Sequence, residues 1–276
     1  MVWHARLNLN YQVENQRCVA RYDHSGPLRI LQSLYPEGDS ICHNVLVHPP
    51  GGLVGGDTLE LHVKMGPGVH GLVTTPGATR FYRSDGPQAV QTTRLQLDEG
   101  ARLEWLPLEA LCYDACNAVN RLQLDLAPGA QCLGWDVTAL GLPLANLPFV
   151  SGCLEQQLEI PGVWLERGRV SANDARLMDG PTGLAGHRCV ATLFFASGTP
   201  WSRADKEALL DTARETLSAH SLASTAGVTS PNSRTLVLRV LAPTVEPAMQ
   251  LLRAVRKGWR AHAWQLHGHD PRIWAM

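Results

Sequence analysis

The chain contains little charge of either sign. Only 18% of its 276 residues are Asp, Glu, Lys or Arg, and 24 basic residues nearly cancel 25 acidic ones, which leaves a net charge of −1. A protein that binds the phosphate backbone of nucleic acid needs a basic surface. We therefore expect no nucleic-acid partner. Because hydrophobic residues make up 45% of the chain, part of its surface is expected to be covered by other proteins.

The sequence also lacks a long apolar run. No stretch approaches the roughly 20 residues that a membrane-spanning helix needs. Residues 1–9 alternate between apolar and polar side chains, which indicates a strand and not a secretory signal. The seven cysteines are scattered and odd in number, which fits free thiols in a reducing compartment better than a disulfide framework. We expect a cytoplasmic protein with no membrane partner.

Alternation of apolar and polar residues dominates the first two thirds of the chain. Three units each contain an alternating strand, a turn at Gly68, Gly100 or Gly129, and a second strand, and a weaker fourth unit lies at residues 158–165. A repeat of about 30 residues favours stacked strand-turn-strand coils. A β-sandwich, whose strands also end in Gly and Pro turns, explains the periodicity equally well.

Two segments near the C-terminus have helical periodicity. Ser202 and Asp205 form a capping box for a helix expected at about 203–220, and Thr244 can cap a second helix at about 245–261. Each segment carries an apolar stripe on one face, which predicts that both helices pack against the β body.

The predicted organisation is one domain over residues 1–276. Its β body covers about 1–200 and 234–242, and the two helices lie outside these ranges. Residues 221–233 are rich in Ser, Thr, Gly and Pro, a composition that predicts a connector between the first helix and the last strand.

A glycine-rich stretch at residues 49–57 is the most unusual local feature. It holds Gly51, Gly52, Gly55 and Gly56 and ends at Asp57. A phosphate-binding loop would require a Gly-Lys-Ser/Thr sequence and a following helix, whereas an alternating strand follows here. The stretch therefore predicts a tight connection between strands rather than a nucleotide site.

A second polar stretch occupies residues 74–84 and follows another strand. Its Arg80, Tyr82 and Arg83 could orient an anion or a partner's carboxylate through forked donors. A solvated loop of the same composition is an equally good interpretation, and the residues alone do not decide between them.

Other clusters suggest metal or acid–base chemistry. Cys112 and Cys116 lack a second matching pair at zinc-site spacing, so a buried role as small apolar residues is favoured. Glu104, Glu109 and Asp114 could serve as acid–base carboxylates of a β-helical polysaccharide hydrolase or lyase. Glutamates on solvated strand faces explain the same alternation.

Taken together, five stretches of this sequence resemble one known family, the urease accessory protein UreD, called UreH in some bacteria. The stretches that carry the resemblance are residues 49–57, 74–84, 103–109, 133–136 and 271–274. The resemblance implies a mainly β fold, a right-handed β-helix-like stack of strand-turn-strand coils with two α-helices in the C-terminal region. This favours coils over a sandwich.

The resemblance also implies a function. Members of the family are not enzymes; they form a complex with UreF and the GTPase UreG, dock on the urease apoprotein and help to deliver nickel to its active site. GTP would be bound by the partner only, nickel would be present in transit only, and no tightly bound cofactor is expected. A β-helical hydrolase or lyase is the alternative, but such enzymes are usually secreted and act on acidic polysaccharides through a basic cleft.

Nickel in transit requires oxygen and nitrogen ligands that release the ion readily. On the family interpretation, we expect such ligands at His48 and Asp57 beside the glycine-rich stretch, and at Glu60, Glu104 and Glu109. The arginines and tyrosine of the second stretch, and the four glycines of the first, are expected to be structural or interface residues. They are Arg80, Tyr82, Arg83, Gly51, Gly52, Gly55 and Gly56.

Overall fold

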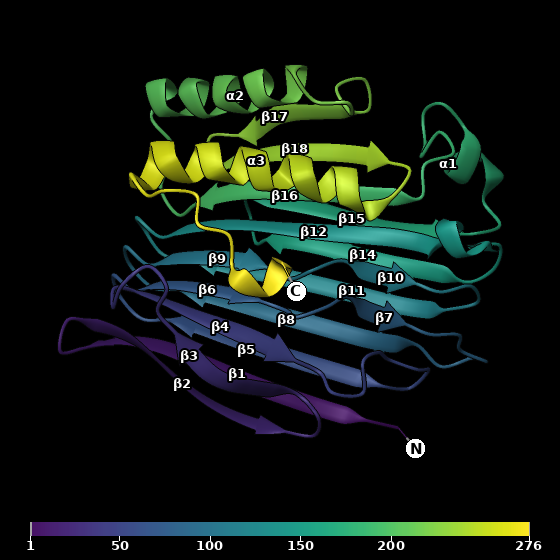
Figure 1. The fold of residues 1–276 in the computed structure, drawn as a ribbon, viewed down its shortest axis with the longest axis horizontal. Helices are drawn as coiled ribbons and strands as arrows, with labels where there is room; N and C mark the ends of the chain where they lie inside the picture. The colour runs from purple at the N-terminus through teal and green to yellow at the C-terminus, as the bar shows by residue number, and fades with distance from the viewer. Residues whose placement is uncertain (1, 276) are drawn as a thin grey trace.

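The computed structural model describes residues 2–275, which form two facing β-sheets and a layer of helices outside the second sheet (Figure 1). We call the seven-stranded sheet, in the order β15-β14-β11-β8-β5-β1-β2, sheet A. Its strands are β1 (His4–Glu14), β2 (Arg17–Ser25), β5 (Thr58–Met65), β8 (Ala89–Leu97), β11 (Asn117–Leu126), β14 (Cys153–Ile160) and β15 (Trp164–Ser171).

Sheet B is the larger sheet, and its main path runs β17-β18-β16-β12-β9-β6-β4-β3. The strands of this path are β3 (Arg29–Leu34), β4 (Ile41–Val47), β6 (His70–Thr74), β9 (Arg102–Leu106), β12 (Gln131–Leu142), β16 (Cys189–Ser197), β17 (Ala226–Asn232) and β18 (Thr235–Ala242). Three short strands extend it: β7 (Thr79–Phe81), β10 (Ala110–Cys112) and β13 (Leu147–Pro148).

The chain winds between the two sheets as a β-solenoid of about four turns. Strands β1, β5, β8, β11 and β14 run parallel in sheet A, and β4, β6, β9 and β12 run parallel in sheet B. Gly68, Gly100 and Gly129 turn the chain from A to B with φ of 66°, 68° and 74°, a conformation that glycine adopts without strain. The predicted stack of coils is confirmed.

The prediction for residues 158–165 was wrong in one respect. Strands β14 and β15 do not form a further coil but an antiparallel hairpin within sheet A, with Ile160 opposite Trp164. Along sheet B, β12 already pairs with the antiparallel β16, so the parallel series ends there. The turn at Gly162 has the Pro-Gly sequence of the coil turns at Gly68 and Gly129, so the turn sequence alone does not distinguish a hairpin from a coil.

The predicted connector at 221–233 also differs from the structure. It contains β17, which pairs antiparallel with β18 at the edge of sheet B. An edge strand tolerates Pro231 because the missing N–H costs no internal ladder bond. Residues 226–232 contain few β-forming residues, yet they form a strand because they pair with the apolar strand β18.

Helices cover one face of sheet B only. The helix α2 (Arg203–Ser218) begins at Ser202, whose side chain accepts a hydrogen bond from Asp205 N at 3.0 Å. The longer α3 (Val245–Trp264) lies in front of β16 and β18 (Figure 1). The remaining short helices are α1 (Ala175–Asp179), η1 (Pro143–Ala145) and η2 (Arg272–Ala275). No helix within residues 2–275 has both the length and the apolar composition needed to cross a lipid bilayer.

The molecule has two apolar cores. One fills the solenoid between the sheets, where residues such as Leu61, Leu95 and Leu124 are buried. The other lies between sheet B and the helices, where Trp259 of α3 stacks near Phe195 with ring centroids 6.0 Å apart. The outer face of sheet A carries no helix among the described residues, so it is the uncovered side of the fold.

Candidate functional site at the loop end of the solenoid

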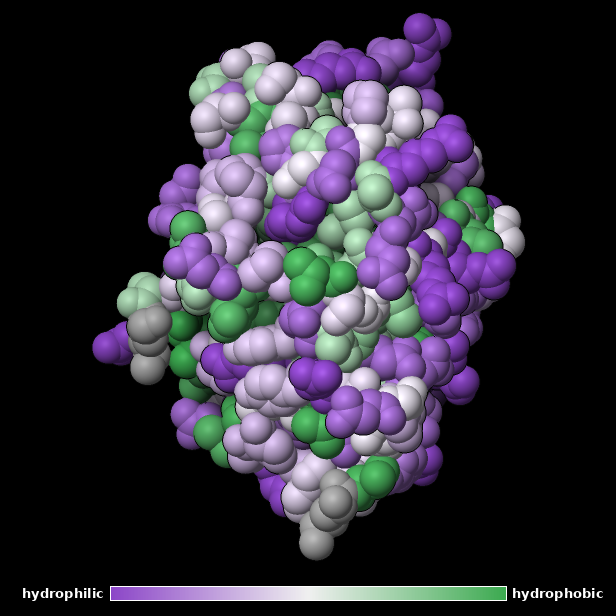
Figure 2. Space-filling view, turned by 90° about the vertical axis from the view of Figure 1, so that its right-hand side faces the viewer, coloured by the Kyte–Doolittle hydropathy of each residue, from purple (hydrophilic) through white to green (hydrophobic). Residues whose placement is uncertain are grey.

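All connections that return the chain from sheet B to sheet A lie at one end of the solenoid. They comprise residues 48–57, 75–88, 107–116 and 143–152. We call this end the loop end; it lies on the right in Figure 1 and faces the viewer in Figure 2. Because consecutive coils stack in register, the two stretches that the sequence analysis singled out become neighbours there.

The glycine-rich stretch is stacked on the second stretch. Leu53 N donates to Arg80 O at 2.7 Å, and Tyr82 N donates to Leu53 O at 2.9 Å. A Cβ added to Gly52 would lie 2.8 Å from Arg80 O, and one added to Gly55 would lie 2.8 Å from a neighbouring backbone carbonyl oxygen. The glycines are therefore required for close packing between coils, as the connection interpretation predicted.

The same stacking continues through the next two connections. Tyr113 N donates to Phe81 O at 3.0 Å, and Ala115 N donates to Ser151 O at 3.0 Å. The Asp114 carboxylate accepts from the backbone N–H groups of Val150 and Ser151 at 2.9 and 2.8 Å. This ladder makes the loop end a rigid surface rather than a set of separate loops.

The polar residues of the second stretch divide into packed and exposed groups. Tyr82 packs its ring 5.1 Å from that of Tyr113, and Arg80 Nη1 donates to Gly51 O at 3.4 Å. The side chain of Arg83 is 74% exposed beside Asp85. Arg80 and Tyr82 therefore hold coils together, and Arg83 presents a cation to solvent.

Apolar side chains are exposed at the same end. Leu144, Leu147 and Val150, all in the last connection, have exposed fractions of 89%, 54% and 61%. Beside them a mostly apolar cavity of about 330 Å³ lies between η1 and the start of α3. Figure 2 shows apolar patches among polar side chains over this end. A rigid surface with exposed apolar groups is suited to binding another protein.

Two of the predicted nickel ligands, His48 and Asp57, lie in the first connection of the loop end. Asp57 is buried, and its carboxylate accepts from Trp3 N at 2.7 Å and from Val54 N at 3.0 Å. His48 has a buried Nε2 without a hydrogen-bond partner among residues 2–275. Burial lowers the pKa of His48, although the Asp57 charge opposes this shift, so the imidazole is neutral and its nitrogen is available as a ligand.

Glu104 lies elsewhere, beneath α3. The sequence interpretation of Glu104 as a residue on a solvated strand face was wrong, because α3 covers that face of β9. Its carboxylate accepts from Arg256 Nε at 2.7 Å and from Arg260 Nε at 3.0 Å, and all three side chains are fully buried. Burial raises the pKa of Glu104, but Arg256, His70 and Arg260 outweigh it and lower the pKa to about 2.

The other two predicted ligands are also apart. Glu60 lies on the outer face of sheet A and pairs with Arg6 at 2.7 Å, and that hydrogen bond lowers the pKa of Glu60. Glu109 lies in the third connection, where its backbone oxygen accepts from Thr79 N at 2.9 Å. Within residues 2–275, no three His, Cys, Asp or Glu side chains are grouped closely enough to hold a metal ion. Cys112 and Cys116 are buried in the core.

A carboxylate that was not among the candidate site residues lies inside the solenoid. Asp136 of β12 accepts from Asn120 Nδ2 at 2.9 Å, from Thr138 Oγ1 at 3.3 Å and from the Gln156 amide, so the polar cluster joins both sheets. Burial raises the pKa of Asp136 to about 6, although the three hydrogen bonds oppose this shift. The alternation of side chains along β12 predicts the position of Asp136. Leu133 and Trp135 face the helices, so Asp136 faces the interior of the solenoid.

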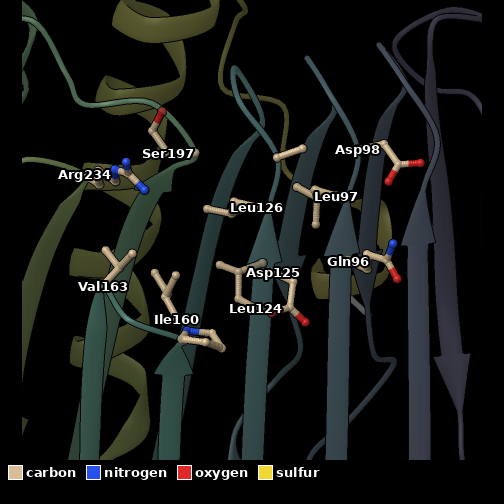
Figure 3. A pocket seen from close by; sticks show the side chains of 13 residues that line it. Gln96, Leu97, Asp98, Leu124, Asp125, Leu126, Ile160, Val163, Ser197 and Arg234 are labelled. Atoms are coloured by element: carbon tan, nitrogen blue, oxygen red, sulfur yellow. The ribbon is translucent and has the colours of Figure 1, made fainter.

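A second, larger cavity lies at the end where the glycine turns are. It has a volume of about 420 Å³ and is lined by Leu97, Leu126 and Ile160 with polar residues at its rim. In Figure 3 the side chains of Asp98 and Asp125 come from neighbouring coils and do not converge on a common point. A glycoside hydrolase directs two carboxylates at one bond, and the labelled side chains of Figure 3 are not arranged in this way.

Comparison with known proteins identifies relatives along the whole chain. The model of the family described as UreD urease accessory protein matches residues 4–275. A "Urease accessory protein UreD" of Variovorax paradoxus (strain S110) is 63% identical over 275 residues, and one of Verminephrobacter eiseniae (strain EF01-2) is 63% identical over 276 residues; both alignments cover 100% of each chain. A namesake from Methylibium petroleiphilum is 51% identical over 99% of each chain.

Proposed function

The chain belongs to the UreD urease accessory protein family, and from that premise we propose that it acts as a scaffold in the maturation of urease. As an accessory protein it is not an enzyme. In the proposed role it binds UreF and UreG, docks with them on the urease apoprotein in the cytoplasm and facilitates delivery of nickel to the active site.

The loop end is the observation that carries this proposal. Four connections are locked into one surface by backbone hydrogen bonds, and the last of them exposes Leu144, Leu147 and Val150. Preformed surfaces of this kind bind partners without a large ordering cost. The surface also includes the stretches 49–57 and 74–84, by which the chain resembles its family.

The structure supports assigning GTP to a partner. A phosphate-binding loop presents its backbone N–H groups to the ligand. Here Leu53 N donates to Arg80 O and Gly56 N donates to Gln88 O at 2.9 Å, and Gly51 N and Asp57 N donate to carbonyl oxygens of the same connection, so these donors are used within the fold. We therefore propose that this chain takes part in a GTP-dependent process without binding the nucleotide.

Nickel is the cargo in the proposed role and not a resident cofactor. Of the five ligands expected from the sequence, we propose that His48 and Glu109 contact the ion in transit, and that Asp57, Glu60 and Glu104 serve the fold through their existing partners. We add Asp136, because its three hydrogen bonds do not offset its burial, which raises its pKa to about 6, and a borderline divalent ion would supply a compensating positive charge. These groups provide oxygen and nitrogen ligands without a closed ring of thiolates.

Activation of urease in cells tests the proposal. Cells that lack this chain are supplied with the wild type, with Leu144→Asp/Val150→Asp, or with Leu31→Asp as a control at an exposed apolar residue outside the loop end. We expect nickel content and urease activity to require the chain, to fall with the loop-end variant and to remain with the control. Full nickel loading in cells without the chain would contradict the proposed function.

A further inference from the structure

The outer face of sheet A carries four exposed arginines, which we call the arginine face: Arg94, Arg121, Arg167 and Arg169. They lie on β8, β11 and β15, where alternate side chains point away from the solenoid interior. Parallel sheets are usually covered on both faces. The uncovered face of the sheet therefore holds the backbones of these four arginines at fixed relative positions.

These arginines differ from Arg6 and Arg21 on the same face of sheet A, which pair with Glu60 and Glu14. Arg6 pairs with Glu60 at 2.7 Å, whereas the four residues of the arginine face form no ion pair within residues 2–275. Arg169 Nη2 donates a weak hydrogen bond to Cys153 Sγ at 3.7 Å, and the other guanidinium donors are available to an external acceptor. The planar guanidinium group of an arginine can donate two parallel hydrogen bonds to the two oxygens of one carboxylate.

Three of the four arginines line a hollow. Arg121 lies in register with Gln157, and Gln157 lies in register with Arg167, so the two arginines are about 10 Å apart at Cα across two strand spacings. Between them on this face lies Gln157 of β14. A cavity of about 360 Å³ is lined by Arg121, Gln157, Arg167 and Arg169. It can accept a protruding side chain between three cations.

The acidic residues of this face decide what kind of anion fits. Glu155 lies in register with Arg169, and Glu159 accepts from Gln157 Nε2 at 2.7 Å. A rigid polyanion such as a DNA duplex would hold its phosphates over these carboxylates and be repelled. Separate carboxylates on a protein segment can reach the arginines and avoid the glutamates. Leu165, which is 55% exposed and in register with Glu159, adds an apolar contact at the edge.

We propose that the arginine face is a docking surface for an acidic segment of a protein partner in the maturation complex. The segment places carboxylates against Arg121 and Arg167 and an apolar side chain near Leu165. The inference rests on the proposed function for the identity of the complex, but its chemistry follows from the face itself. It assigns a second contact surface, on the uncovered sheet, separate from the loop end.

The test uses the full chain, tagged and produced together with the urease apoprotein and the other accessory proteins. Captured urease is measured between about 50 and about 500 mM NaCl, a range over which exposed charge interactions become screened. The variant is Arg121→Glu/Arg167→Glu. The matched control is Arg203→Glu/Arg214→Glu, an equal change of charge on α2, where both arginines are exposed. Thermal unfolding confirms that each variant folds.

We expect the arginine-face variant to capture at least about tenfold less urease at low salt, and the control to capture as much as the wild type. Poly-L-glutamate should compete with capture, and duplex DNA should not. Equal capture by the variant and the wild type at every salt concentration would overturn the docking surface and leave the proposed function standing. Competition by DNA as strong as that by poly-L-glutamate would also overturn it. Failure of the wild type to capture any urease would instead contradict the proposed function.

Discussion

Arg256 of α3 and Glu104 of β9 meet across 152 residues of sequence, and neither side chain is exposed to solvent. Arg260 adds a second hydrogen bond to the same carboxylate and also pairs with Glu37 at 2.7 Å. Arg256 Nη1 donates to His269 O at 2.9 Å, in the segment that follows α3. This network attaches α3 and the C-terminal segment to the solenoid.

We expect Glu104→Gln to destabilise the protein strongly. Removing one partner of a buried ion pair leaves an uncompensated charge and typically costs about 3–5 kcal/mol. The measurement is the free energy of unfolding in urea. The control is Glu60→Gln, which breaks the exposed pair with Arg6 and should cost less than about 1 kcal/mol. Equal losses for the two variants would show that burial does not set the strength of the Glu104 network.

Close packing at the loop end predicts different effects at different glycines. Gly52→Ala places a methyl group against Arg80 O and the Tyr82 ring, whereas Gly77→Ala meets no atom within 4 Å. Overpacking of this kind typically costs about 1–3 kcal/mol. We expect Gly52→Ala to lower the unfolding temperature and urease activation, and Gly77→Ala to change neither. The packing interpretation would be wrong if Gly52→Ala left both at the wild-type level.

The packed glycine loop also predicts that the chain binds neither GTP nor ATP. The backbone N–H groups of Leu53 and Gly56 already donate hydrogen bonds to the next coil. Residues 49–57 also contain no Lys, which a phosphate-binding loop requires. Equilibrium dialysis of the full chain with labelled nucleotide and Mg²⁺ should show no binding, with a P-loop GTPase as the positive control. Binding in the micromolar range would refute the prediction.

Asp136 predicts a pH dependence of stability. Its pKa in the folded protein is about 6, higher than the value of about 3.9 for a solvated Asp. Between about pH 4 and about pH 6, Asp136 is therefore mostly protonated in the folded protein and mostly ionised in the unfolded chain. Its contribution to stability is complete below about pH 4 and is lost as the pH rises through about 6.

The variant Asp136→Asn removes this titration. Relative to wild type, we expect it to gain stability as the pH rises from about 4 to about 7, measured as the free energy of unfolding in urea at each pH. Asp85→Asn is the control, because the side chain of Asp85 is 91% exposed. A difference between wild type and Asp136→Asn that stays constant with pH would contradict the raised pKa.

The coils could be predicted from the sequence because each depends on local features. Gly100 N donates to Pro128 O at 3.4 Å, and the turn glycines at 68, 100 and 129 lie on top of one another, so equal spacing in the sequence becomes stacking in space. Periodicity alone fits a sandwich as well, since it does not state which strand pairs with which. The resemblance to a family resolved that choice.

The remaining features depend on pairings between distant residues. The turn at Gly162 has the sequence of a coil turn, yet it closes a hairpin because no parallel position remains beside β12 in sheet B. Glu104 sits in an alternating strand, and only the position of α3 makes it buried. Tertiary contacts of this kind leave no local signal in a single sequence, whereas strand alternation does carry a signal for the inward position of Asp136.

The buried carboxylate of Asp57 predicts linked losses of stability and of nickel loading. Each oxygen accepts one backbone N–H, from Trp3 and from Val54, and Asp57→Ala leaves both donors without this partner. An unpaired buried donor costs about 1–3 kcal/mol. Asp57→Asn keeps one acceptor oxygen and loses the charge. We expect stability to fall in the order wild type, Asn, Ala, and nickel loading of urease to fall in parallel.

Urea unfolding and the nickel content of co-produced urease measure the two properties on the same set of variants. A parallel decline shows that Asp57 acts by holding the glycine-rich stretch in place. A direct role in nickel transit predicts a different pattern, in which Asp57→Asn unfolds close to the wild-type urea concentration and still loads far less nickel. That pattern would contradict the structural role, since the lost charge alone, with the loop intact, would then account for the loss of nickel.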